Sequence, residues 1–496
     1  MSLLWRQTDP NGCDKPDICA HLSLAGYSAR VGNVDLARFQ FAITSIYHFL
    51  FVPLTIGMAF LIAVLQTKWH RSGNEDYRRL TKFFGKLLVI NIAIGVVTGL
   101  IQEFQFGMNW SAYSRFVGDV FGAPLAMEGL AAFFLESTFL GLWLFGWGRL
   151  SRRVHLTCIW LVAVGAALSA MFIMSANSWM QNPVGYQTNA STGRPELNDI
   201  GAVFTNPVFL WSYTHVLLAS AVTGAIMMLA VSAWQIRKRG DGKIFLRSAK
   251  VSLAVLFPSI VLAMGVGSEL GVTEATYQPM KIAAAEAQWE TCQPCSFSAF
   301  QIGGGNNDQD PTKIIEIPYL LSFLATNSFD GQVIGLNELQ AQYEQEYGPG
   351  YYIPNVFIQY WSMRVMAYTA SAVALLALIG LWLWHRGTLQ QTTWFLRIST
   401  LAVVTPYIMN TAGWLLTENG RQPWVVQGLM LTEDGVSTSV SSTEIIISLA
   451  VFLTVFVIVG TIWIILMSRA ARSKLPDVEP ESDGEATEEP IPTLTY

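Results

Sequence analysis

Two histidines lie inside long apolar runs, where histidine is rare. His48 is in SIYHFLFVPL and His215 is in LWSYTHVLLAS. Each is about nine residues from the end of its run, which is roughly 14 Å along a helix. An imidazole nitrogen is a good iron ligand, so both are candidate metal ligands. Taken alone, either one could equally be a hydrogen-bonded packing residue.

Two further potential metal ligands lie in other apolar runs. Met366 (SMRVMAY) is about ten residues into its run, and Glu418 (GWLLTENGRQPW) closes another run just before Arg421. Thioether and carboxylate groups also bind metals. Met366 could instead fill the core, and Glu418 could cap a helix beside Arg421. The similar depth of these residues and the two histidines favours a shared metal-binding role.

Three carboxylates lie within apolar runs or at their edges. Glu128 and Glu136 share one run (PLAMEGLAAFFLES), and Glu103 (IQEFQFG) ends another. On an ideal helix Glu128 and Glu136 differ by a rise of roughly 12 Å and a rotation of roughly 80°. Carboxyl groups at successive depths could carry protons inward. Hydrogen-bonded structural carboxylates are the alternative.

Lys281 and Glu286 share a stretch (KIAAAEAQWE) that lies close to an apolar run. A basic and an acidic group near a membrane surface suit a quinol headgroup, which one can hold while the other accepts a proton. An ordinary surface charge pair is the alternative, and spacing alone favours it. Arg364 lies roughly 200° around a helix from Met366, so it faces a different neighbour, of which Glu418 is one candidate.

The composition is that of a helical integral membrane protein. Of 496 residues, 52% are hydrophobic and only 13% are charged, whereas soluble proteins are about 25% charged. Mean hydropathy is +0.38 and the pI is about 5.8. These values exclude a soluble enzyme, a disordered chain and a nucleic-acid-binding protein.

The elements that must position the candidate residues are long apolar segments. Nine are long enough to span a bilayer, and they are expected to be helices because an open sheet would leave backbone groups unpaired in lipid. They lie at about 39–66, 85–102, 124–147, 156–178, 206–236, 250–270, 356–384, 396–418 and 442–467. We therefore expect an all-α integral membrane protein of nine transmembrane helices.

Most of the 30 Lys and Arg residues fall in one set of connecting loops. The positive-inside rule then places the N-terminus outside and the C-terminus in the cytoplasm. The predicted parts are an external N-terminal segment (1–38), helices 1–6 (39–270), an external loop (271–355), helices 7–9 (356–467) and a disordered acidic cytoplasmic tail (468–496). Residues 1–38 lack the apolar run of a cleavable signal peptide, so the first helix is expected to be retained.

Four of the five cysteines are external by this topology: Cys13, Cys19, Cys292 and Cys295. An oxidising environment favours disulfides, and four cysteines allow three pairings. A zinc site is the alternative. Cys158 lies in a span and is expected to be an apolar filler.

The sequence strongly resembles the larger, haem-bearing subunit (subunit I) of cytochrome bd-type quinol oxidases. The resemblance runs from about 35 to 467 and is dense in several motifs. They are YHFLFVPLTIGMAF (47–60), FGKLLVIN (84–91), EFQFGMNW (103–110), VGDVFGAPLAMEGLAAFFLEST (117–138), NSWMQNP (177–183) and GRQPW (420–424).

The resemblance implies a role for each candidate residue. His48 matches the ligand of a high-spin haem, usually haem d; His215 and Met366 match the ligands of the low-spin haem b; and Glu418 matches the ligand of the high-spin haem b, beside Trp414 and Arg421. The family differs internally over which high-spin site holds haem d. Glu128 and Glu136 match carboxylates on the proton route, with Glu103 nearby. Lys281 and Glu286 match the quinol-binding pair, and Arg364 would reach a haem propionate.

The resemblance therefore implies a terminal oxidase of a bacterial respiratory chain, in the inner or plasma membrane, with helices bundled around two haem b and one haem d. It would oxidise ubiquinol or menaquinol outside and reduce O2 to water with cytoplasmic protons, generating proton motive force without pumping. A second membrane subunit is implied as a partner, and small single-helix accessory subunits would fit. The alternatives are a proton-coupled secondary transporter using Glu128 and Glu136, or a haem b quinol dehydrogenase subunit that does not bind oxygen.

Overall fold

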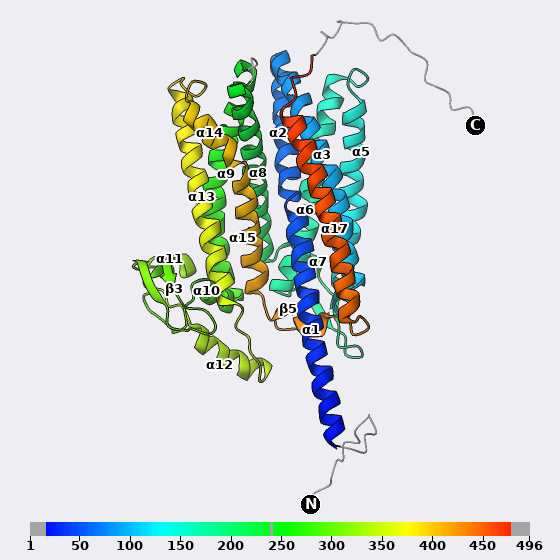
Figure 1. Cartoon of the computed structure of the whole chain (residues 1–496), viewed down its shortest axis with the longest axis vertical. Helices are drawn as coiled ribbons and strands as arrows, with labels where there is room; N and C mark the ends of the chain where they lie inside the picture. The colour runs from blue at the N-terminus through cyan, green and yellow to red at the C-terminus, as the bar shows by residue number, and fades with distance from the viewer. Residues whose placement is uncertain (1–15, 239–241, 478–496) are drawn as a thin grey trace, which may run out of the picture.

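Long, roughly parallel helices form a bundle, with a small folded lobe beside one end (Figure 1). The structure, a computed structural model, describes residues 16–238 and 242–477. The tail predicted to be disordered lies largely outside these residues, as do Cys13 and the rest of residues 1–15. Residues 16–38 of the predicted N-terminal segment belong to helix α1. The α-helices are α1 (Pro16–Phe49), α2 (Val52–Ser72), α3 (Glu75–Gly107), α4 (Ser111–Met127), α5 (Phe134–Phe145), α6 (Arg152–Gln181), α7 (Ile200–Phe204), α8 (Pro207–Lys238), α9 (Gly242–Tyr277), α10 (Pro279–Ala285), α11 (Leu320–Thr326), α12 (Leu336–Tyr347), α13 (Val356–His385), α14 (Thr393–Leu401), α15 (Thr405–Gly420), α16 (Thr432–Gly435) and α17 (Ser442–Ala471).

The remaining elements are short. A π-helix, η1, covers Glu128–Phe133, and a 3₁₀ turn, η2, covers Ala402–Val404. Three antiparallel two-stranded ribbons pair β1 (Tyr186–Thr188) with β2 (Pro195–Leu197), β3 (Phe297–Ile302) with β4 (Thr312–Ile317), and β5 (Trp424–Val426) with β6 (Met430–Leu431).

Eight helical segments in the described residues are long and apolar enough to cross a membrane. Each overlaps one of the predicted spans over most of its length, so the prediction of a multi-pass helical membrane protein is confirmed. They are Gly32–Ser72, Glu75–Gly107, Ser111–Phe145, Arg152–Gln181, Pro207–Lys238, Gly242–Tyr277, Val356–His385 and Ser442–Ala471.

The ninth predicted span, 396–418, is helical but irregular. It is built from α14, the 3₁₀ turn η2 and α15, with Pro406 in the first turn of α15. Proline lacks the N–H that an unbroken α-helix would need at this point. The segment is not among the eight that meet the length and hydropathy criteria, so the count of nine spans stays a prediction.

Two of the predicted helices are also interrupted beside candidate residues. The first breaks between α1, which ends at Phe49 one residue after His48, and α2, in which Pro53 is the second residue. The third changes at Glu128 from α-helix to the π-helix η1. The rotation of about 80° expected between Glu128 and Glu136 assumed an ideal α-helix and does not apply across η1.

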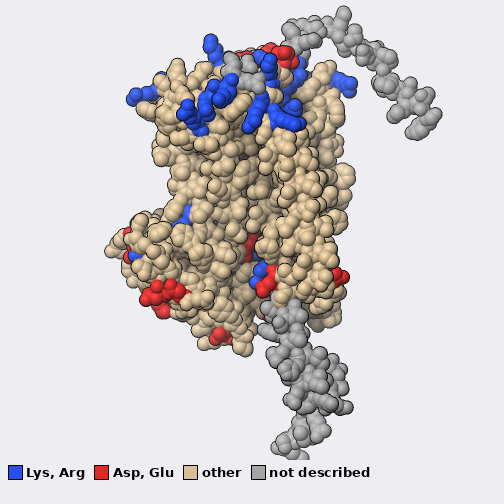
Figure 2. All heavy atoms as spheres, viewed as in Figure 1, with Lys and Arg blue, Asp and Glu red and all other residues tan. Residues whose placement is uncertain are grey.

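Basic side chains gather at one end of the bundle, opposite the lobe (Figure 2). Helix α1 runs from the lobe end, and α17 ends among the basic residues (Figure 1). The direction in which the bundle inserts into a membrane stays a prediction.

The lobe is built from the predicted external loop and is folded. Its first residues continue helix α9 to Tyr277, seven residues beyond the predicted boundary at 270. Helices α10, α11 and α12 and the β3–β4 ribbon follow. The lobe has its own apolar cluster, which includes Trp289, Leu336 and Tyr343 and extends to Trp424 after α15. This cluster fixes the lobe against the end of the bundle that carries Glu418.

Candidate functional site

His48 is oriented by α3. Its Nδ1 lies 3.0 Å from Thr98 Oγ1, and that hydroxyl donates its own hydrogen to the Gly95 carbonyl oxygen at 2.9 Å. Thr98 therefore accepts from His48, which places the imidazole proton on Nδ1 and leaves the Nε2 lone pair for a metal. Gly99 faces the ring, and a Cβ there would lie 3.1 Å from His48 Cε1.

His215, on α8, is held in the same tautomer. Its Nδ1 lies 3.1 Å from the carbonyl oxygen of Ala263 on α9. A carbonyl can only accept, so Nδ1 carries the proton and Nε2 has a free lone pair. Gly267 lies against this ring, and a Cβ there would be 3.2 Å from Cε1.

Met366, on α13, faces α15. A Cβ on Gly413 would lie 3.1 Å from Met366 Sδ. Helix α15 also contacts α8 through a hydrogen bond of 3.1 Å from Asn410 Nδ2 to Thr223 Oγ1. Helix α15 therefore packs against the helices that carry Met366 and His215.

Glu418 lies in the last turn of α15 with both carboxylate oxygens hydrogen-bonded. Asn177 Nδ2 donates to Oε1 at 2.8 Å, and Arg421 Nη2 donates to Oε2. Arg421 is buried and also donates to the Val425 carbonyl oxygen. Trp414, one turn earlier, stacks on Phe49 of α1 at a ring-centroid distance of 5.2 Å, so it lies close to the segment that carries His48.

Two of the three predicted proton-route carboxylates, Glu128 and Glu136, lie in a thinly covered segment of the bundle. Only 6% of the most apolar stretch of Ser111–Phe145 is buried, against 72% for that of α8. Glu128 accepts a hydrogen bond of 2.6 Å from Ser169 on α6, and Gly165 packs against Glu136. Glu103 is exposed near the end of α3.

Lys281 is buried rather than on the surface, and its partner is not Glu286. Its ammonium donates to Glu274 Oε1 at 2.9 Å and to Gln181 Oε1 at 2.6 Å. The alternative of an ordinary surface charge pair is therefore wrong. Burial lowers the pKa of Lys281, and the carboxylate of Glu274 opposes that shift.

Glu286 pairs instead with Arg364, at 2.7 Å between Oε2 and Nη2. The same guanidinium donates to the backbone carbonyls of Ala285 and Ser298 and lies over the Tyr360 ring. Burial raises the pKa of Glu286, and Arg364 offsets this in part. The expectation that Arg364 reaches Glu418 is wrong, because its contacts are with the lobe. Its predicted contact with a haem propionate stays untested.

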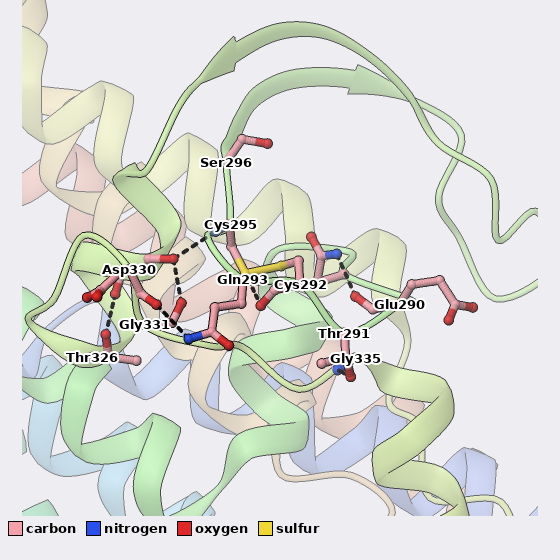
Figure 3. The surroundings of a disulfide bond; sticks show 12 residues. Glu290, Thr291, Cys292, Gln293, Cys295, Ser296, Thr326, Asp330, Gly331 and Gly335 are labelled. Carbon is pink, nitrogen blue, oxygen red and sulfur yellow. Dashed lines mark hydrogen bonds between the residues drawn. A yellow bond between two sulfur atoms is a disulfide. The ribbon is translucent and has the colours of Figure 1, made fainter.

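The lobe contains one disulfide, Cys292–Cys295, among the described residues (Figure 3). Cys292 exchanges backbone hydrogen bonds with Val333, and Gln293 donates to the Asp330 carbonyl oxygen. Ser322 Oγ accepts from the Cys295 N–H at 2.7 Å. The disulfide therefore closes a short loop just before β3, and hydrogen bonds attach this loop to α11 and to the segment after it. The zinc alternative for these two cysteines has no support.

The chemistry of these side chains fits haem. Three of the four candidate ligands offer a free imidazole nitrogen or a thioether, and a glycine packs against each of these three side chains. Within residues 16–238 and 242–477, no three His, Cys, Asp or Glu side chains converge as they would around a bare metal ion. A porphyrin supplies the equatorial ligands of its iron, so one or two axial side chains suffice.

Three residues of the site were not predicted from the sequence. Asn177, Gln181 and Glu274 contact Glu418 or Lys281 directly. Asn177 and Gln181 stand in the NSWMQNP motif, which was one available signal, but amides are too common in membrane helices to be singled out by type.

Fold and site together define a multi-pass helical membrane protein that carries imidazole, thioether and carboxylate groups within its bundle. Over residues 36–475 the chain matches the family described as cytochrome bd terminal oxidase subunit I. It is 45% identical over 444 residues to the cytochrome bd ubiquinol oxidase subunit 1 of Bacillus subtilis (strain 168), covering 88% of this chain and 93% of that protein.

It is also 36% identical over 496 residues to the cytochrome bd-II ubiquinol oxidase subunit 1 of Escherichia coli (strain K12), covering 88% of this chain and 96% of that protein. The solved structure of the bd oxidase from Geobacillus thermodenitrificans matches with a TM-score of 0.81 at 29% identity, covering 89% of this chain and 98% of that one. The chain belongs to the cytochrome bd terminal oxidase subunit I family. The predicted family and enzyme class, an oxidoreductase acting as a terminal oxidase in a membrane, are confirmed.

Proposed function

We propose that the chain is the haem-bearing subunit of a quinol:oxygen oxidoreductase that oxidises quinol at the lobe and reduces O2 to water inside the bundle. Family membership carries the oxidase assignment. The single structural observation that carries the cofactor assignment is the orientation of His48 and His215, each with Nδ1 hydrogen-bonded and Nε2 free.

We assign His215 and Met366 to a low-spin haem b, and His48 and Glu418 each to a high-spin haem, for two haem b and one haem d in all. Haem, when bound, would supply one-electron transfer and a place for oxygen to react. His215 and Met366 would together hold the low-spin haem, whereas His48 and Glu418 would each hold a high-spin haem alone. The side chains of α8 and α13 thus serve electron transfer, and those of α1 and α15 serve the oxygen site.

At the lobe, Lys281 holds the quinol headgroup and Glu286 accepts a proton. The raised pKa of Glu286 supports this role, because a general base works best when its pKa approaches the ambient pH. Glu103, Glu128 and Glu136 hold protons that travel from the opposite end toward the oxygen site. If the lobe faces outward, as the basic residues at the other end indicate, this movement generates proton motive force without pumping.

A second membrane subunit is the expected partner. The rest of the bundle covers little of Ser111–Phe145 and of α17, since only 6% and 11% of their most apolar stretches are buried. This exposure supports contact with another apolar surface. Glu128 and Glu136 lie in the first of these segments, where contact with lipid would be costly for a carboxylate. Accessory single-helix subunits and the kind of quinone, ubiquinone or menaquinone, stay open within this proposal.

The test is an absorption spectrum of the purified, dithionite-reduced protein and of two variants. The wild type should show haem b bands and a chlorin-type band in the red. His215→Ala and Met366→Ala should each remove the low-spin haem b signal and leave the high-spin bands. As a matched control, Met228→Ala truncates a buried methionine of α8 and should leave all bands in place. A low-spin signal that survives both ligand substitutions would reject this ligation.

A further inference from the structure

A continuous row of hydrogen bonds joins the lobe to the carboxylate of Glu418. Lys281 Nζ donates to Gln181 Oε1 at 2.6 Å, Gln181 Nε2 donates to Asn177 Oδ1 at 2.8 Å, and Asn177 Nδ2 donates to Glu418 Oε1 at 2.8 Å. Glu274, bonded to Lys281, lies at the far end of the row. Lys281 and Gln181 are each 1% exposed and Asn177 is 6% exposed, so water competes little for these bonds.

The charges at its two ends fix the direction of every bond in the row. An ammonium only donates, so Gln181 must present its oxygen to Lys281. A carboxylate only accepts, so Asn177 must present its NH2 group to Glu418. The remaining atoms, Gln181 Nε2 and Asn177 Oδ1, then match as donor and acceptor. Hydrogen bonds aligned head to tail in a buried site polarise one another.

Local sequence makes the row possible at two points. Asn177 and Gln181 are four residues apart at the end of α6, so they lie on one face of the helix. Gly420, at the end of α15, lies against the stem of Lys281, and a Cβ there would be 2.4 Å from Lys281 Cγ. Glycine at this position lets α15 and α10 approach closely enough for one row to reach both.

We infer that Gln181 and Asn177 are positioning residues that couple the quinol-binding lysine to the haem-ligating carboxylate, with Glu274 as the counter-ion that holds Lys281 in place. This inference rests on the proposed function of Lys281 and Glu418. A carboxylate has about four lone-pair sites. Asn177 and Arg421 occupy one on each oxygen of Glu418 and so determine which lone pairs remain for iron.

The row transmits orientation and charge rather than protons. Amide side chains do not release a proton near neutral pH, so Gln181 and Asn177 cannot pass one from Lys281 to Glu418. Their aligned dipoles instead carry the effect of the ammonium charge toward the carboxylate. Loss of one amide should therefore alter both the environment of the Glu418-bound haem and the handling of quinol at the lobe.

The experiment compares Gln181→Leu, Gln181→Glu and a control in the intact oxidase. Gln235→Leu is the control, because Gln235 is also 1% exposed and makes two hydrogen bonds, to Ala471 and Ser473 at the opposite end of the bundle. The readouts are the haem spectrum, the midpoint potential of the Glu418-bound haem, quinol KM and kcat, and the thermal midpoint.

Gln181→Leu should keep all haems, shift the spectrum and potential of the Glu418-bound haem, and lower kcat/KM for quinol by about 10- to 100-fold, the usual effect of removing a residue that supports a ligand. Gln181→Glu keeps an acceptor for Lys281 but loses the donor to Asn177. It should restore quinol KM and leave the spectral shift. Gln235→Leu should lower only the thermal midpoint.

The inference is overturned if Gln181→Leu behaves like Gln235→Leu, with a lower thermal midpoint and an unchanged haem spectrum, potential and quinol KM. Should Gln181→Leu fail to fold, Gln181→Glu decides alone, since an unshifted spectrum in that variant contradicts the coupling. Absence of haem from the wild-type protein would instead reject the proposed function.

Discussion

The lobe contains two buried ion pairs whose surroundings differ. Arg364 donates to Glu286 and to the backbone carbonyls of Ala285 and Ser298, so its hydrogen bonds all remain within the lobe and its supporting helix α13. Lys281 donates instead to Glu274 and Gln181, which belong to membrane-spanning helices α9 and α6. The first pair holds the lobe together, and the second connects the lobe to the bundle.

This difference explains why Lys281 and Glu286, only five residues apart in the sequence, belong to ion pairs that connect different parts of the molecule. A guanidinium has five donors in a planar fork and suits a site where several carbonyls converge. An ammonium is a compact charge on a flexible stem, so it can respond to a ligand. We therefore assign Arg364 to the stability of the lobe and Lys281 to quinol binding, while Glu286 keeps the proton-accepting role proposed above.

The largest expected effect separates the two pairs by stability. Arg364→Met leaves Glu286 buried without a partner, which typically costs about 3–5 kcal/mol. Hydrogen exchange of the amides in β3 and α10 should then accelerate strongly. Lys281→Met should accelerate it much less, because Gln181 and Glu274 are anchored in long helices, but it should abolish quinol oxidation.

Two controls sharpen this prediction. Arg364→Met combined with Glu286→Gln removes the unpaired charge and should recover much of the lost protection. Arg364→Lys keeps the charge but not the fork and should fall between wild type and Arg364→Met. Equal loss of protection in Lys281→Met and Arg364→Met would contradict the division between a stabilising arginine and a functional lysine.

A smaller effect is expected from the disulfide. Cys295 lies three residues before Ser298, whose carbonyl oxygen accepts a hydrogen bond from Arg364. The disulfide therefore supports the part of the lobe that Arg364 holds. Closing so short a loop stabilises by about 2 kcal/mol in the chain-entropy treatment. Replacing both Cys292 and Cys295 by Ser should speed amide exchange in β3 and leave quinol KM unchanged. A raised quinol KM with unaltered amide exchange would mean that the disulfide supports quinol binding rather than the stability of the lobe.

The candidate ligands were predictable because their types are rare where they occur. His48 and His215 interrupt apolar runs, and His48 also lies within a family motif (47–60). The helical bundle followed from composition alone, since membrane-spanning backbone has few alternatives. Breaks at η2 and η1 were not predictable, because hydropathy averages over the single residues, such as Pro406, that alter the backbone.

The partners of the charged residues could not be read from spacing. Lys281 and Glu286 invited pairing by their separation, yet each pairs with a residue from another helix. Contacts between elements far apart in the chain depend on how helices pack, which no local pattern encodes. The same reason hid Gln181 and Asn177, whose role follows only from their place between Lys281 and Glu418.

The smallest predicted effect is a difference in pH dependence between the two pairs. Burial raises the pKa of Glu286, so the folded lobe holds that proton more tightly than the unfolded chain. The stability it contributes is present below about pH 4.3, the usual glutamate pKa, and is lost as pH rises through the raised value. Burial lowers the pKa of Lys281, so its contribution to the stability of the folded lobe is lost as pH falls through the lowered value.

Amide hydrogen exchange, corrected for intrinsic rates, measures this stability at each pH. In Glu286→Gln the loss of stability at rising pH should disappear, and in Lys281→Met the loss of stability at falling pH should disappear. The same response from both variants would mean that the pairs titrate as one unit, and the division drawn between them would fail.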